Sequence, residues 1–115
     1  MKVAMTVWGN RISPVFDSAQ TILLADIENG EVIAQRREFL PRLVASGLAR
    51  MLVEKNIDTL ICGAISERPA QIFQQADIRL LSFVSGSADR FLETYAANEP
   101  IDSFVMPGCS RDNAA

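Results

Sequence analysis

Three short segments of the chain carry residue types that could hold a ligand. Residues 8–17 read Trp-Gly-Asn-Arg-Ile-Ser-Pro-Val-Phe-Asp and follow an apolar run. Residues 62–66 read Cys-Gly-Ala-Ile-Ser and also follow an apolar run, and residues 106–109 read Met-Pro-Gly-Cys. These segments offer backbone N–H groups, an arginine and two thiols, but no paired acid and base. Their chemistry favours binding over catalysis.

The composition excludes several other classes of function. The chain has no histidine, which removes the commonest general base and the commonest nitrogen ligand for transition metals. Its net charge of −3 disfavours nucleic acid as a partner. The two cysteines do not form a Cys-x-x-Cys pair, so they provide neither a zinc spacing nor a redox pair. No glycine-rich phosphate-binding motif is present.

The length of 115 residues and a hydrophobic fraction of 49% fit one globular domain. We expect residues 1–109 to form that domain and residues 110–115, which are small and polar, to form a flexible tail. No apolar run is long enough to span a membrane, and the run after Met1 is too short for a secretory signal. A cytoplasmic protein without a membrane partner is therefore expected.

Turn-forming residues separate apolar runs in an alternating pattern that predicts an α/β fold. The expected strands are residues 3–8, 21–27, 32–39, 59–62 and 79–84, and the expected helices are residues 43–56, 68–76 and 88–97. Asn29-Gly30 predicts a type I′ turn between the second and third strands. Right-handed crossovers then predict a five-stranded mixed sheet of order 3-2-1-4-5, in which only strand 2 is antiparallel.

That strand order predicts a crevice beyond the carboxyl ends of strands 1 and 4, where the first two segments meet. Ser66 and Ser87 are placed to cap the helices that follow them, so two helix N-termini would face this crevice. Arg11 would add a full positive charge. These features suit an anion, although small residues also occur in such loops simply because tight turns need them.

Several stretches resemble the dinitrogenase iron-molybdenum cofactor biosynthesis family. They are Lys2-Val-Ala, the loop Gly-Asn-Arg-Ile-Ser-Pro-Val-Phe-Asp, the turn Ile-Cys-Gly-Ala-Ile, the pair Ser85-Gly86 and the end Phe104-Val-Met-Pro-Gly-Cys109. The resemblance implies a ribonuclease-H-like three-layer α/β/α sandwich and the binding of metal-sulfur clusters. Small members of the orange-protein type hold a molybdenum-copper sulfide cluster without covalent attachment, and larger relatives carry the nitrogenase cofactor or its precursor.

The resemblance and the loops together predict a non-catalytic binding or carrier protein for an anionic molybdenum-containing metal-sulfide cluster of the Mo-Cu-S or iron-molybdenum type. The sulfides of such a cluster saturate its metals, so the protein need supply only positive charge, N–H donors and an apolar wall. A cluster-donor or acceptor protein would be the further partner. The expected cofactor-binding residues are Trp8, Asn10, Arg11, Ile12, Ser13, Phe16, Gly63, Ala64, Ile65, Ser66, Ser85, Gly86 and Ser87, and Cys109 is the candidate metal ligand.

Two other functions remain open at this point. The chain could be a regulatory interaction module of the same fold that binds no cluster. A nuclease is less favoured, because the first strand carries no acidic residue for a metal-ion pair.

Other residues have plainer expected roles. Cys62 is expected in the core, Asp17 as a loop anchor and Met5, Met51 and Met106 as core filler. Of Arg36 and Arg37, only one can extend the positive rim, because neighbours on a strand point to opposite faces.

Overall fold

The computed structural model describes residues 1–40 and 44–108, and their long strands form one mixed sheet. The strands are β1 (Lys2–Trp8), β2 (Arg11–Ile12), β3 (Thr21–Glu28), β4 (Glu31–Phe39), β5 (Thr59–Ile61) and β6 (Arg79–Leu81). Five of these strands lie in the order β4-β3-β1-β5-β6, and β2 pairs with β1 beside this path. Strand β3 is antiparallel to β1 and to β4, whereas β1, β5 and β6 are parallel. The predicted mixed α/β fold is confirmed, and the short strand β2 was not predicted.

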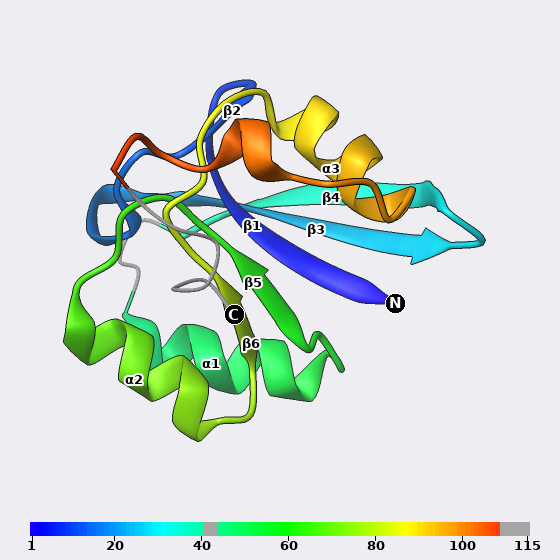
Figure 1. Ribbon diagram of the computed structural model, residues 1–115. Helices are drawn as coiled ribbons and strands as arrows, with labels where there is room; N and C mark the ends of the chain where they lie inside the picture. The colour runs from blue at the N-terminus through cyan, green and yellow to red at the C-terminus, as the bar shows by residue number, and fades with distance from the viewer. Residues whose placement is uncertain (41–43, 109–115) are drawn as a thin grey trace.

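Helices cover both faces of this sheet (Figure 1). The helices α1 (Ala45–Glu54) and α2 (Glu67–Gln75) lie on one face, and α3 (Ala88–Ala96) lies on the other. Two short 3₁₀ helices, η1 (Phe16–Ser18) and η2 (Asp102–Phe104), complete the regular structure of residues 1–40 and 44–108. The expected residue 43 of the first helix and the expected tail lie outside the described residues.

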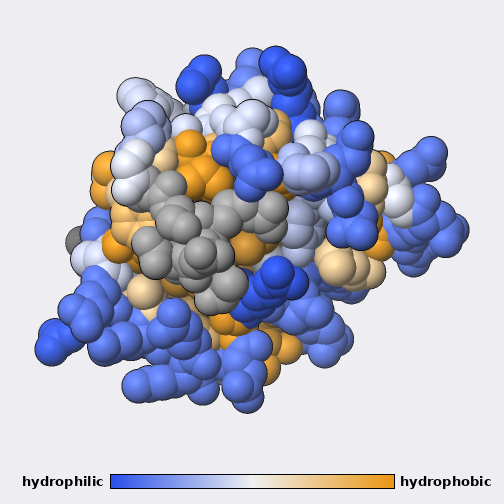
Figure 2. Space-filling view, viewed as in Figure 1, coloured by the Kyte–Doolittle hydropathy of each residue, from blue (hydrophilic) through white to orange (hydrophobic). Residues whose placement is uncertain are grey.

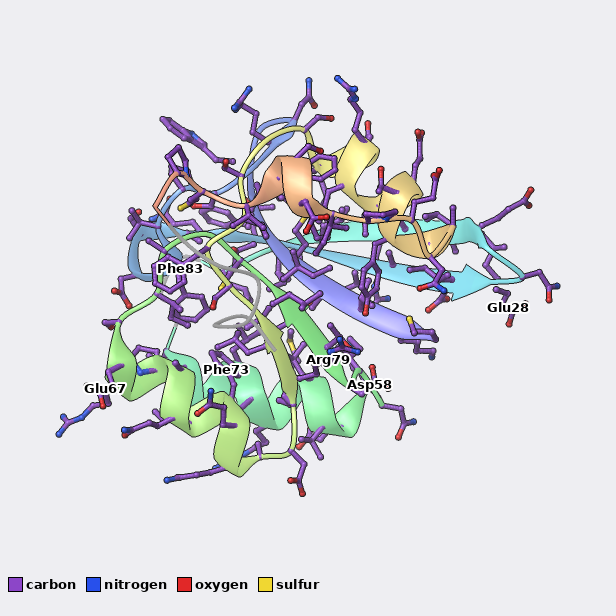
Figure 3. All side chains as sticks on the ribbon, in the orientation of Figure 1. Glu28, Asp58, Glu67, Phe73, Arg79 and Phe83 are labelled. Carbon is purple, nitrogen blue, oxygen red and sulfur yellow. The ribbon has the colours of Figure 1, made fainter. Side chains whose placement is uncertain are left out.

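The core is divided by the sheet into two apolar layers. On one side Leu48 and Leu52 of α1 and Phe73 of α2 pack against the sheet, and on the other side Phe91 and Leu92 of α3 do so. Figure 3 shows Phe73 pointing from α2 toward the sheet. Residues 3–7 of β1 are all buried, which confirms that the first strand is covered on both faces.

All three helices end with the same backbone motif and without glycine. Asn56, Asp77 and Asn98 follow α1, α2 and α3 with positive φ angles of 59°, 61° and 58°. In each case the next N–H donates to the carbonyl five residues earlier: Ile57 to Leu52, Ile78 to Phe73, and Glu99 to Thr94. This is the Schellman motif, which satisfies the last carbonyls of a helix and usually places glycine at the left-handed position.

The hairpin β3–β4 projects beyond the helices and leaves β4 exposed at the sheet edge (Figure 1). Asn29 and Gly30 have φ angles of 53° and 80°, as the predicted type I′ turn requires. A register shift at Asp26 and Ile27 and the charges of Arg36 and Arg37 interrupt the free edge, and both features oppose edge-to-edge pairing. Figure 2 shows hydrophilic side chains over the hairpin end. Among the described residues, none of the helices has the length and apolar character of a membrane span.

The helix ends yield the first prediction. Asp77→Gly should stabilise the fold by about 0.5–1 kcal/mol, because glycine adopts positive φ without strain and the change removes an acidic charge from a helix C-terminus. Urea unfolding followed by circular dichroism measures the effect. Gln74→Gly, inside α2, is the matched control and should destabilise by a similar amount. If both variants lose stability, the positive φ angle of Asp77 does not reduce the stability of the fold, and the prediction is wrong.

Candidate functional site

The segments that follow β1, β5 and β6 meet at one end of the sheet. We call this region the loop edge and define it as residues 8–19, 62–66 and 82–87. It lies at the end of the sheet opposite the tip of the β3–β4 hairpin (Figure 1). All the predicted cofactor-binding residues fall within it. Cys109, the predicted metal ligand, lies outside the described residues.

Backbone hydrogen bonds join the three segments of the loop edge to one another. Between the first and second segments, the N–H of Phe16 donates to the carbonyl of Ala64 and the N–H of Ala64 donates to the carbonyl of Pro14, each at 2.8 Å. Between the first and third segments, the N–H of Ile12 donates to the carbonyl of Gly86 at 2.9 Å. The N–H of Ala88, at the start of α3, donates to the carbonyl of Asn10 at 2.9 Å. Isolated bridges pair Arg11 with Ser87 and Val15 with Ala64. These four amides bind neighbouring loops, so they are not available to a ligand in the predicted crevice between β1 and β5.

Gly63 allows the closest of these approaches. A Cβ atom at this position would overlap the carbonyl oxygen of Ser13 and lie 2.5 Å from that of Pro14. Any side chain would therefore push the first two segments apart. Glycine at position 63 serves the packing of two loops in this structure, which is neither an anion site nor the tight turn that the sequence suggested.

Two residues expected to form an apolar wall belong to the core instead. Ile12 and Phe16 are each only 2% exposed, and Phe16 stacks edge-on against Phe73 with ring centres 5.5 Å apart. Ile65 is also buried. The assignment of Ile12 and Phe16 as ligand-facing residues is corrected, because their side chains close the ends of the two core layers.

The two predicted helix caps differ. The Ser87 hydroxyl accepts the N–H of Arg90 at 3.3 Å, so its capping role is confirmed. Ser66 occupies the N-cap position of α2, but its hydroxyl donates to Oδ2 of Asp17 at 3.3 Å and makes no capping bond. Asp17 thereby ties the first segment to the second, as expected of a loop anchor.

Trp8 and Arg11 are two of the predicted site residues that are exposed to solvent. Trp8 is 75% exposed and Arg11 is exposed. The two residues are direct partners in the β1–β2 pair, so their side chains leave the same face of the sheet. Asn10 is exposed beside them, and Ser85, Gly86 and Ser87 are half-buried.

Two residues of β4 extend this surface and were not identified as site residues from the sequence. Nη1 of Arg37 donates to the carbonyl oxygen of Gly9 at 2.7 Å, which settles that Arg37, not Arg36, reaches the loop edge. Phe39 is 67% exposed and lies next to Thr21, which pairs in turn with Val7. A groove of about 380 Å³ is lined by both Trp8 and Phe39.

Cys62 is the first residue of the second segment of the loop edge, and its side chain is fully buried, as expected. Burial, together with the negative charge of Asp17, raises the pKa of its thiol to about 12. A neutral, enclosed thiol is a poor ligand and a poor nucleophile. Among the described residues, histidine, cysteine and carboxylate side chains form no group of three that could hold a metal ion.

Comparisons with known proteins agree with the fold. Residues 1–98 match the family described as "Dinitrogenase iron-molybdenum cofactor". An uncharacterized protein of Methanocaldococcus jannaschii is 22% identical over 83% of this chain and 85% of its own. The crystal structure of a protein named PH0822 superposes with a TM-score of 0.78 at 18% identity, over 89% of this chain and 95% of that one.

A second solved structure is similar to the chain at slightly higher identity. It is a crystal structure from Methanocaldococcus jannaschii, provisionally described as a dinitrogenase, with a TM-score of 0.69 and 25% identity. The match covers 86% of this chain and 90% of that one.

The contact at Gly63 predicts opposite effects for two glycine-to-alanine changes. Gly63→Ala should lower the free energy of unfolding by about 1–3 kcal/mol, because the added methyl group has no space. Gly47→Ala should raise it by about 0.5–1 kcal/mol, since Gly47 lies in α1 and no atom lies within 4 Å of its added Cβ. Urea unfolding of both variants measures the difference. Equal stability of the two variants would contradict the close approach.

The buried thiol predicts a pH dependence. The raised folded-state pKa means that the contribution of the neutral Cys62 thiol is fully present below pH 9.0 and is lost as the pH rises toward 12. In a Cys109→Ser background, Cys62 should resist iodoacetamide at pH 8 until urea unfolds the chain. The stability advantage over Cys62→Ala should also shrink between pH 8 and pH 11. Rapid alkylation of the folded protein would refute this description of Cys62.

Proposed function

The chain belongs to the dinitrogenase iron-molybdenum cofactor family, and we propose that it binds and carries an anionic molybdenum-containing metal-sulfide cluster without catalysing a reaction. The proposal rests on one observation, the exposed surface formed by Trp8, Arg11, Arg37 and Phe39, which we call the cargo surface. Trp8 and Phe39 both line one groove, Arg37 bonds the carbonyl oxygen of Gly9 in that lining, and Arg11 pairs with Trp8.

The chemistry of a thiometallate cluster suits such a surface. Its terminal sulfides are weak, diffuse hydrogen-bond acceptors, and its negative charge is spread over a large volume. Arg11 supplies exposed positive charge. One N–H of Arg37 donates to the carbonyl oxygen of Gly9, and this bond holds the Arg37 guanidinium against the loop edge. Trp8 and Phe39 offer the exposed apolar surface that Ile12 and Phe16, being buried, do not provide.

This proposal requires a cluster that arrives with its own ligands. The chain contains no histidine, and the Cys62 thiol is enclosed and neutral. Cys109 remains the proposed soft ligand for copper or a similar metal. A molybdenum-copper cluster of the orange-protein type is the proposed cargo, and the ribonuclease-H-like classification of the sandwich belongs to the same proposal.

One observation also favours a second function, that of an interaction module. Trp8 and Phe39 are large exposed aromatic side chains, and aromatic and arginine residues are enriched where proteins bind one another. A cluster-donor or acceptor protein would use the same cargo surface. Without a cluster, the chain would instead regulate such a partner by binding alone.

Anaerobic reconstitution tests the cluster. Mixing the protein with tetrathiomolybdate and copper(I), followed by desalting, should give a coloured complex with a fixed ratio of molybdenum and copper to protein. Trp8 is the single tryptophan, so its fluorescence should be quenched in proportion to the bound metal. The double variant Arg11→Ala/Arg37→Ala should bind at least about tenfold more weakly, since each removes a charged hydrogen-bond donor.

A matched control separates site binding from general charge. Arg50→Ala removes an exposed arginine from α1, outside the loop edge, and should bind like the unchanged protein. A colourless protein after desalting would contradict cluster binding. A coloured complex that the double variant retains at full strength would place the cluster elsewhere. A protein partner that is retained equally by Arg11→Ala would favour the interaction module.

A further inference from the structure

A second groove lies away from the loop edge, between the β3–β4 hairpin and the C-terminal end of α1. Its volume is about 470 Å³, within the range of small-molecule sites. Leu24, Ala25 and Asp26 of β3 and Ala34, Gln35 and Arg36 of β4 form one wall, and Lys2, Lys55, Asn56 and Ile57 complete the lining.

Positive charge predominates in this groove, although the chain as a whole is acidic. Lys2 of β1, Arg36 of β4 and Lys55 after α1 come from three separate elements, and Asp26 is the one carboxylate of the lining. The chain as a whole has a net charge of −3, so three cations against one carboxylate in this lining is the reverse of the overall balance of charge.

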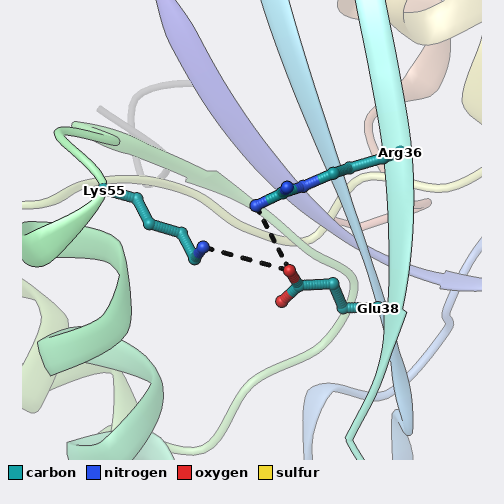
Figure 4. A network of polar contacts seen from close by, with 3 residues as sticks. All are labelled: Arg36, Glu38 and Lys55. Carbon is teal, nitrogen blue, oxygen red and sulfur yellow. Dashed lines mark ion pairs between the residues drawn. The ribbon is translucent and has the colours of Figure 1, made fainter.

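The ion pairs around the groove leave this positive charge only partly balanced. Glu38 lies 3.3 Å from Nη2 of Arg36 and 3.9 Å from Nζ of Lys55, so two cations share one carboxylate (Figure 4). The Lys55 side chain is 35% exposed and the Arg36 side chain is 61% exposed. Both can therefore turn toward a ligand without unfolding the chain, because surface pairs of this kind are weak.

The rest of the lining would hold the body of an organic ligand. Leu24 and Ile57 are 7% and 5% exposed and give the groove an apolar floor. Asn56 also lines the groove and carries an amide side chain, which is a neutral donor and acceptor.

From this arrangement we propose that the groove binds a small organic anion, a molecule with a phosphate or carboxylate group attached to an apolar body. The anionic group lies between Arg36, Lys55 and Lys2, and the apolar body lies on Leu24 and Ile57. The site is separate from the cargo surface and does not depend on the proposed cluster.

Phenyl phosphate is the probe for a test by NMR, because it joins a dianion to one aromatic ring. In ¹H–¹⁵N spectra of the full chain, titration should shift the amides of residues 24–26, 34–36 and 55–57 in a saturable way. Phenol, which has the ring without the phosphate, should produce no saturable shift there. Raising the salt concentration should weaken binding of the phosphate, as expected for a charged contact near the surface.

Two variants and one control locate the charge. Arg36→Ala and Lys55→Ala should each weaken phenyl phosphate binding about tenfold, the effect of losing one charged hydrogen bond. Arg68→Ala, an exposed arginine of α2 outside the groove, should leave binding unchanged. The spectrum of each free variant reports whether it is folded. Shifts that appear equally at residues 8–11 and 37, or binding that survives both groove variants, would overturn the proposal.

Discussion

The packing of the first loop against Gly63 is the constraint on which the rest of the loop edge depends. Because residue 63 lacks a side chain, the carbonyl groups of Ser13 and Pro14 can lie over it, and Ala64 can exchange backbone hydrogen bonds with Pro14 and Phe16. That contact lies beside the buried Phe16, and the chain before it turns back on itself at residues 8–11, where Trp8 pairs with Arg11. Trp8 and Arg11 are both exposed.

The same packing continues to the third segment through a strained residue. Phe83 has a φ angle of 61°, which is unusual for a bulky side chain, and Figure 3 shows it near the loop edge. Its N–H donates to Gly63 and its carbonyl accepts from Met106, at 2.9 Å in both cases. Such a conformation persists only when its surroundings hold it. Gly63 therefore contacts two of the other loop-edge segments at once, through the first loop and through Phe83.

Much of the fold was predictable because its signals are local. The type I′ turn depends on Asn29 and Gly30 alone, and the buried first strand is visible in an unbroken apolar run. The capping role of Ser87 depends on its own helix. The structure of the site was less predictable, because glycine in a loop has the same appearance whether it cradles an anion or admits a neighbouring chain. Only the position of Ser13 and Pro14, fifty residues earlier in sequence, decides between these uses.

Residues of β4 illustrate the same limit. The alternation of a strand implied that Arg36 and Arg37 face opposite sides, but the register with β3 decides which one reaches Gly9. Phe39 joins the cargo surface only because Thr21 stands between it and Val7 in the sheet. Lys55 meets Glu38 across the gap between a helix end and an edge strand. Each of these contacts joins residues that are far apart in the sequence and forms only in the assembled sheet. A short stretch of sequence therefore cannot predict it.

The closure of the loop edge also changes what kind of binding a carrier of this fold can use. Amides held in a crevice would enclose an anion, whereas the amides of Ile12, Phe16, Ala64 and Ala88 already serve the fold. In the proposed carrier, attraction would then come chiefly from the surface side chains Arg11 and Arg37, where water and salt weaken each charge. An inorganic cluster bound in this way would stay accessible from outside. For the proposed carrier, that accessibility is an advantage, because a recipient protein could contact the cluster before the carrier releases it.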